Sequence, residues 1–243
     1  MASNFENVAY TVGWICADHM GFATARAMLD AQHGRPQTQH GLDDNTYTLG
    51  RIGPHNVVIT CLSLGGRGTV GAALAASRLI SSFPIIRFGL LVGTGGGIPT
   101  DEYDIRLGDV AVSAPNQTFG GVVQIDFGKA TPRGFERTGS LNKPPRALMT
   151  AIQDVRANHF MGNSQTSRYL NELCAANTIT ADAYTYPGVQ NDKFFSPDSL
   201  HQDPSRKSCT KCTGIKRRSR RKDTAPVIHY GTIASGNKII RTA

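Results

Sequence analysis

The stretch LLVGTGGGIPTD, residues 90–101, places four glycines in five positions directly after an apolar run. The apolar run predicts a buried strand, and glycines at its end allow a tight turn or the close approach of a ligand to backbone N–H groups. A Walker phosphate loop would end in Gly-Lys-Ser or Gly-Lys-Thr, and a dinucleotide fingerprint would need a glycine where the chain has Ile98. Two interpretations stay open: a structural turn, and a strand end that binds an anionic or sugar group.

The segments on both sides of this stretch alternate between strand and helix patterns. Strands are predicted in 10–17, in 46–66 as a hairpin, in 85–97, in 105–115 and in 226–236. Helices are predicted in 22–34, 69–83 and 144–160. This alternation predicts an α/β fold with helical layers on both faces of a sheet.

The composition favours one globular domain over residues 1–243, because a chain of this length with 40% hydrophobic residues can bury a substantial core. Neither a signal-peptide pattern nor an apolar segment long enough to span a membrane is present in the sequence. Five scattered cysteines do not suggest a disulfide framework. We therefore expect a cytoplasmic protein without a membrane partner.

The net charge of +8 is concentrated in one part of the chain. Nine of the 26 basic residues lie within 206–222, a segment without acidic residues. This segment belongs to an irregular stretch at about 184–225, which we interpret as a basic insertion. The run KRRSRRK, 216–222, could bind nucleic acid or direct nuclear import, but it has no aromatic residues for base stacking. A solvated charge run is the favoured interpretation, so a nucleic-acid partner is not expected.

The pair Cys209 and Cys212 has the CxxC spacing of a zinc site. A structural zinc ion needs four ligands, and only an irregular set with His201 and His229 could supply them. A plain loop pair is favoured, and no metal site is predicted.

Five motifs in one order carry a resemblance to a known family: VGWICA (12–17), LGGRGTVGAALAA (64–76), VGTGGGIP (92–99), IRLGDVAVSAP (105–115) and HYGTIASGNKII (229–240). This set resembles the nucleoside phosphorylase and nucleosidase superfamily. It is most similar to the purine and uridine phosphorylase-like domains at the N-termini of fungal multidomain proteins that carry NTPase or repeat modules.

The resemblance implies a three-layer α/β fold with a mixed, partly barrel-like central sheet flanked by helices, commonly assembled into homo-oligomers. It also implies cleavage of the N-glycosidic bond of a nucleoside or nucleotide, with a purine as the expected base. Phosphate is the nucleophile in phosphorylases and water is the nucleophile in nucleosidases. The family needs no metal or organic cofactor, although phosphate is a possible co-substrate.

The resemblance also assigns roles to particular residues. The loop against ribose and phosphate matches Gly93, Thr94, Gly95 and Gly96, with Thr94 as the phosphate-contacting hydroxyl. The glycine turn that lines the same pocket matches Gly65, Gly66 and Arg67, and Arg67 is either an anion ligand or a solvated side chain. The segment beside the base matches Ile233, Ala234, Ser235, Gly236 and Asn237.

Other residues near these motifs allow both a framework role and a site role. Asp109 matches a framework aspartate, and His229 and Tyr230 could border the pocket or belong to the core. In QIDFGK (124–129), Asp126 or Phe127 could lie at the pocket rim.

The chain departs from the family after its first strand. Similar fungal domains typically read ALPLE there, whereas this chain reads ADHMG, so the expected carboxylate falls at Gly21. Asp18 or His19 could replace it as the catalytic proton acceptor, the alternative being a polar loop.

A second departure lies at the other end of the chain. The FEMEAAG-like segment with the ribose-binding glutamate, and the aspartate that donates to the base, do not appear before Ala243. We therefore expect a domain that is incomplete at its C-terminus, from a longer protein or a shortened gene model, or a member that no longer catalyses. Two hypotheses follow: an enzyme that cleaves a nucleoside or nucleotide, and a noncatalytic nucleoside-sensing or interaction module of a larger protein.

Overall fold

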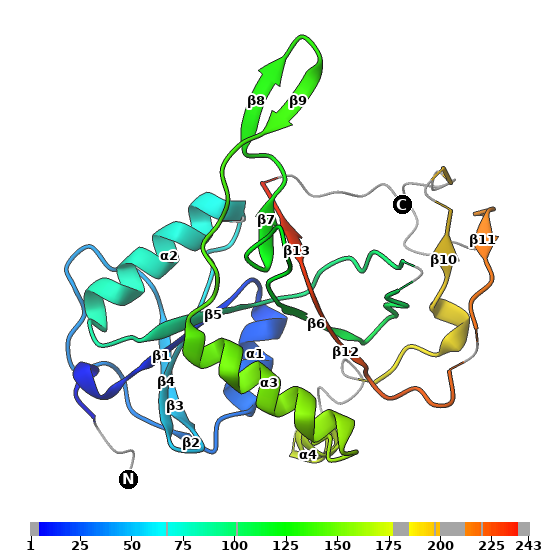
Figure 1. Cartoon of the computed structure of the whole chain (residues 1–243). Coiled ribbons are helices and arrows are strands. Elements are labelled where there is room, and N and C mark those ends of the chain that lie inside the picture. Colours follow the sequence, from blue (N-terminus) through cyan, green and yellow to red (C-terminus); the bar gives the residue numbers. More distant parts are fainter. Residues whose placement is uncertain are drawn as a thin grey trace. The chain divides into compact units, whose positions relative to one another are not determined.

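The computed structural model describes residues 5–66, 68–100, 102–176, 185–196, 198–199, 212–219 and 221–237. The chain forms two compact units, the N-terminal unit Met1–Gly96 and the C-terminal unit Gly97–Ala243 (Figure 1). Each unit is built around sheets of its own, as follows.

The N-terminal unit contains a five-stranded mixed sheet. Its strands are β1 (Val12–Cys16), β2 (Ala31–Gln32), β3 (Tyr47–Ile52), β4 (His55–Cys61) and β5 (Phe88–Val92), in the order β2-β3-β4-β1-β5. The strands β4, β1 and β5 run parallel, whereas β2, β3 and β4 form antiparallel pairs. In the described residues this sheet is open, with β2 and β5 at its edges, so the expected partly barrel-like sheet is not observed there.

Two helices cover opposite faces of this sheet. Side chains alternate between the faces of a strand, so Val12 and Cys16 pack with Ala25 of α1 (His19–Ala27). Ile15 points to the other face and packs with Leu79 of α2 (Gly68–Ser82). A mixed α/β architecture with helices on both faces of the sheet, as expected from the sequence, is therefore present within this unit.

The core of the N-terminal unit contains a cluster of fully buried aromatic rings. Tyr10, which follows the short 3₁₀ helix η1 (Asn7–Ala9), and Phe83, which follows α2, are both 0% exposed. Their rings meet edge to face at 5.7 Å, and Tyr47 meets Phe83 in the same way at 5.1 Å. Such pairs add to the free energy gained by burial alone.

The first helix differs from its prediction over 22–34. It begins three residues earlier, at His19, because Asp18 caps its N-terminus, and it ends at Ala27. Residues 31–32 form the edge strand β2, so pairing with β3 overrides the helical spacing of this segment.

The described residues of the C-terminal unit form four two-stranded sheets. Parallel pairs join β6 (Val110–Ser113) to β12 (Ile228–Gly231) and β7 (Val122–Gln124) to β13 (Ile233–Ser235). Antiparallel pairs join β8 (Gly128–Thr131) to β9 (Gly134–Arg137) and β10 (Phe194–Phe195) to β11 (Ile215–Lys216). The helical elements in its described residues are α3 (Arg146–Phe160), α4 (Thr166–Ala176) and the 3₁₀ turn η2 (Val189–Asn191).

The predicted strand 226–236 is divided at Thr232, so that its halves β12 and β13 pair with different strands. The sheets of this unit are separate pairs, which is why no barrel is closed in its described residues. Helices in the described parts of the chain are all too short or too polar to cross a membrane.

Candidate functional site

Three of the segments singled out from the sequence meet at one edge of the N-terminal sheet. Parallel pairing aligns Cys16 with Cys61 of β4 and with Val92 of β5, so the carboxyl ends of all three strands coincide. The backbone N–H of Ala17 donates to the carbonyl of Val92 at 3.2 Å, and that of Leu62 donates to Cys16 at 3.0 Å. The carboxyl edge of an open α/β sheet is where such folds bind ligands.

The glycines at this edge fall into two groups. A Cβ at Gly93 would lie 2.7 Å from the Ala17 side chain, so close packing favours glycine there, whereas one at Gly66 would lie 2.2 Å from the Ser63 hydroxyl, which can rotate away. A Cβ at Gly95 or Gly96 would contact nothing within 4 Å. These two glycines are therefore not explained by packing within the described structure.

Gly65 is required for a different reason, since its φ of +82° is disfavoured for other residues. Thr94 is exposed in the loop after β5, and Arg67 lies outside the described residues. The helices α1 and α2 begin shortly after β1 and β4, so their N-termini, with partial positive charge, lie at the same edge. The arrangement suits an anionic or polar ligand.

The Asp18 side chain is engaged with its own helix. Its Oδ1 accepts a hydrogen bond from the Gly21 N–H at 2.8 Å, which makes Asp18 the N-cap of α1. His19 is exposed in the first turn. The sequence placed both residues near the site, and the structure places both at the carboxyl edge, with a structural role visible for Asp18.

The Cys16 thiol is buried beside this edge. Burial, followed by the nearby Cys61 and Asp18, raises the pKa of Cys16 to about 12. The thiol is therefore protonated near neutral pH, and Cys16 is a core residue rather than a nucleophile.

The segment Ile233–Asn237 lies in the C-terminal unit, beside QIDFGK. Ser235 pairs with Gln124, Ala234 pairs with Val123, and the Asn237 N–H donates to Asp126 Oδ2 at 2.6 Å. Asp126 thus anchors the backbone of the segment that resembles a base-binding element.

Phe127 lines a cavity of about 150 Å³ next to this anchor. The ring of Phe119 faces the same cavity, with the Arg137 guanidinium 4.7 Å from the ring centroid. The remaining lining residues include Val122 and Gln124 of β7. The sequence singled out Phe127 as a rim candidate. It did not single out Phe119 and Arg137, because these two residues meet only where the segment 137–141 returns beside β7.

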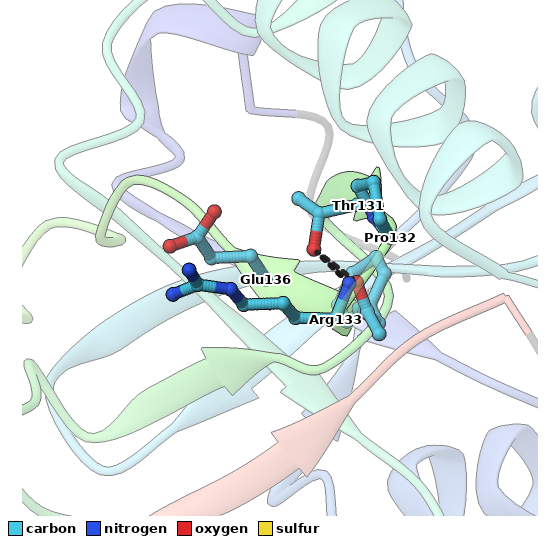
Figure 2. Close-up of a pocket in the computed structure, with 6 residues that line it drawn as sticks. Thr131, Pro132, Arg133 and Glu136 are labelled. Carbon is cyan, nitrogen blue, oxygen red and sulfur yellow. Dashed lines mark hydrogen bonds between the residues drawn. The ribbon is translucent and has the colours of Figure 1, made fainter.

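A second hollow lies at the tip of the β8–β9 hairpin. Figure 2 shows Thr131, Pro132, Arg133 and Glu136 around it, with the Arg133 N–H donating to the Thr131 hydroxyl at 3.3 Å. The charged ends of Arg133 and Glu136 extend from the same side of the hairpin (Figure 2). Consecutive residues of one hairpin turn form this hollow, so it does not bring together side chains from distant parts of the chain.

Asp109 is the centre of a charged network in the C-terminal unit, and its side chain is 1% exposed. It accepts hydrogen bonds from both terminal nitrogens of Arg221, from His229 Nε2 at 2.9 Å, and from the backbone N–H groups of Arg106 and Val227. Burial favours the neutral acid, but these donors outweigh it, with Arg221 first, and they hold the pKa of Asp109 well below its usual value. His229 is therefore a hydrogen-bonded core residue.

The interpretation of 216–222 as a solvated charge run is wrong for two of its arginines. The side chains of Arg218 and Arg221 are only 14% and 22% exposed. Arg218 lies 3.4 Å from Asp192 and stacks on Phe194, with 4.7 Å between Cζ and the ring centroid. These two side chains point inward because they contact aspartates distant in sequence and, for Arg218, an aromatic ring. The composition of the run does not contain this information.

The CxxC hypothesis falls partly outside the described structure, since Cys209 and His201 are not described. In the described residues, no three His, Cys, Asp or Glu side chains are grouped as metal ligands.

No protein-family model matches the chain. The chain is 42% identical over 236 residues to a protein named "Nucleotide-binding leucine-rich repeat (NLR)-like protein" from Hyaloscypha variabilis. The matched region covers 96% of this chain but 23% of that relative. The chain is thus homologous to one segment of a much longer NLR-like protein.

Proposed function

We propose that this chain is a nucleoside- or nucleotide-recognition module of an NLR-like protein, built on a nucleoside phosphorylase-like fold. The observation that carries the proposal is the shared carboxyl edge of β4, β1 and β5, where the glycine loops and the N-termini of two helices meet. The NLR-like relative supports a module within a larger protein rather than a free-standing enzyme.

In this proposal the loop after β5 holds the ribose and phosphate. Backbone N–H groups of Gly95 and Gly96 can approach a ligand closely, because neither residue carries a side chain and neither needs to be glycine for packing. The exposed Thr94 hydroxyl adds one hydrogen-bonding group.

The capping hydrogen bond of Asp18 favours a binding function over a cleavage function. A general base must be able to accept a proton from the nucleophile, and the Asp18 carboxylate already serves as the cap of α1. We place the module in the cytoplasm, as a homo-oligomer that needs neither metal nor organic cofactor.

Calorimetric titration of the full chain with adenosine, inosine, uridine, AMP and ATP tests this proposal. Gly95→Val should weaken binding of the preferred compound at least tenfold, because the added side chain occupies the ligand space. Gly41→Val is the matched control, since a Cβ at Gly41 also contacts nothing within 4 Å and lies in a different loop. Equal losses in both variants, or no binding of any compound, would reject the proposal.

Chromatography of the same mixtures, with and without phosphate, separates recognition from catalysis. Recognition alone predicts intact nucleoside after long incubation. Release of free base by the wild-type chain would instead establish the enzyme.

A further inference from the structure

The basic run in the C-terminal unit contains one hydroxyl group, that of Ser219. The residues before it are Lys216, Arg217 and Arg218. Ser219 is exposed, as are Lys216 and Arg217, and residues 217–219 form neither helix nor strand. An exposed, irregular segment is the form in which a protein kinase can bind a peptide in its active-site cleft.

The charge around Ser219 is arranged in two layers. Arg218 and Arg221 face inward to Asp192 and Asp109, whereas Lys216 and Arg217 remain exposed. The inward arginines are paired within the fold, and the outward residues offer positive charge on the N-terminal side of the hydroxyl. Protein kinases select substrates by complementary charge of this kind.

We propose that Ser219 is a phosphorylation site for a serine/threonine kinase that prefers basic substrates. The γ-phosphoryl group of ATP is transferred to Ser219 Oγ. The new Oγ–P bond forms as the bond between Pγ and the ADP oxygen breaks, and the hydroxyl proton passes to the base of the kinase.

The structure also supplies a receptor for the phosphate. The Arg106 guanidinium donates to the backbone carbonyl of Ser219 and, through Nε, to Asp104 Oδ2 at 2.8 Å. The Asp104 side chain is 47% exposed, so solvent screening weakens its ion pair with Arg106. A phosphoserine carries about −1.5 to −2 charges and three acceptor oxygens, and so it displaces Asp104 as the partner of Arg106.

The first test treats the full chain with ATP and the catalytic subunit of cyclic-AMP-dependent protein kinase, followed by mass spectrometry of the products. We expect one phosphate at Ser219, and at least tenfold less incorporation into Ser219→Ala. Arg217→Ala should also lower incorporation about tenfold. Lys222→Ala, which removes an exposed charge on the other side of Ser219, is the matched control and should retain the wild-type rate. Phosphate that maps to Ser205 or Ser208, or that persists in Ser219→Ala, would overturn the assignment.

The second test measures hydrogen exchange of the peptide 212–219. In the unmodified chain, Asp104→Asn should raise its exchange rate about threefold, because Arg106, Arg218 and Arg221 lose a shared acidic partner. In the phosphorylated chain the same substitution should have a smaller effect, because the phosphate has already replaced Asp104 at Arg106. An equal effect of Asp104→Asn in both forms would reject the phosphate as the partner of Arg106.

Discussion

The two units of this chain are stabilised by different physical means. In the N-terminal unit, apolar side chains from the sheet and both helices are buried in two clusters, one on each face. In the described residues of the C-terminal unit no hydrophobic side chain is buried, and its most enclosed described charge is Asp109, at 1% exposure. Hydrophobic burial is nondirectional, whereas a buried charge depends on every donor around it. The units should therefore respond differently to substitution, salt and pH.

The largest effect should come from the core of the N-terminal unit. Phe83→Ala removes a fully buried ring that contacts Tyr10 and Tyr47, and it should lower the free energy of unfolding by about 3–5 kcal/mol. Urea denaturation followed by hydrogen exchange in β1 and β4 measures this loss. Phe160→Ala, at a position 95% exposed, is the control and should change stability by less than about 0.5 kcal/mol.

The next largest effect should come from the charged network. Asp109→Asn leaves Arg221 without its hydrogen-bonded carboxylate and should destabilise β6 and β12 by about 2–3 kcal/mol. Hydrogen exchange in these strands is the measurement, with Asp154→Asn on the exposed surface of α3 as the control. Faster exchange in β1 and β4 by the same factor would contradict the contrast between the units.

The two units should respond to acid and alkali through different titratable groups, among them Asp109 and Tyr10. Asp109 has a lowered pKa, so its contribution to stability is present above its unfolded value of about 3.9 and is lost as the pH falls below that value. Burial raises the pKa of Tyr10 from 10.0 to about 12, so its contribution is present below pH 10.0 and is lost as the pH rises toward 12. Hydrogen exchange, corrected for its intrinsic pH dependence, should show loss of β6 protection in acid and of β1 protection in alkali.

The measurements at acid pH need a control for the titration of His33 in the N-terminal unit. Burial, and secondarily Arg51, lowers the pKa of His33, so its contribution is lost as the pH falls below about 6.5. Comparison with Asp109→Asn isolates the C-terminal contribution. An unchanged acid response of β6 in that variant would show that another group controls it.

A smaller effect is expected at the cap of α1. Asp18→Ala removes the acceptor for the Gly21 N–H and should cost about 1 kcal/mol, whereas Asp18→Asn retains a cap and should cost only a few tenths. Thermal denaturation of both variants gives the difference. Equal losses would show that the charge of Asp18, rather than its capping geometry, stabilises the helix.

The smallest effect is expected on the surface of α4. Arg168 and Glu172 are 3.5 Å apart, and both side chains are more than half exposed. Glu172→Gln should change stability by less than about 0.5 kcal/mol, and added salt should remove the difference. Denaturation at low and high salt checks this, and a loss comparable to that of Asp109→Asn would contradict the proposed hierarchy.

The sequence predicted the N-terminal unit well, because its strands carry strong local signals. The β-branched run at 57–60 and the short apolar run in 10–17 agree with β4 and β1. The same signals placed the three glycine and polar loops after strands, and parallel pairing then brings those loops together. The two-residue strand β2 was missed because it exists only through pairing with β3.

The C-terminal unit was less predictable, since its structure depends on contacts between distant residues. The division of 226–236 at Thr232 follows from separate partners for its halves, which no local pattern in that segment reveals. The hairpin β8–β9 and helix α4 were not predicted. The burial of Arg218 and Arg221 required knowledge of where Asp109 and Asp192 lie.

The inward pairing of Arg218 and Arg221 also changes what the net charge of +8 means. Affinity for a polyanion arises largely from the release of condensed counterions, roughly one for each phosphate that a free cation neutralises. An arginine that already neutralises an aspartate within the fold releases no counterion when a polyanion approaches. The count of basic residues in 216–222 therefore overstates the salt dependence with which this surface would bind DNA, RNA or heparin.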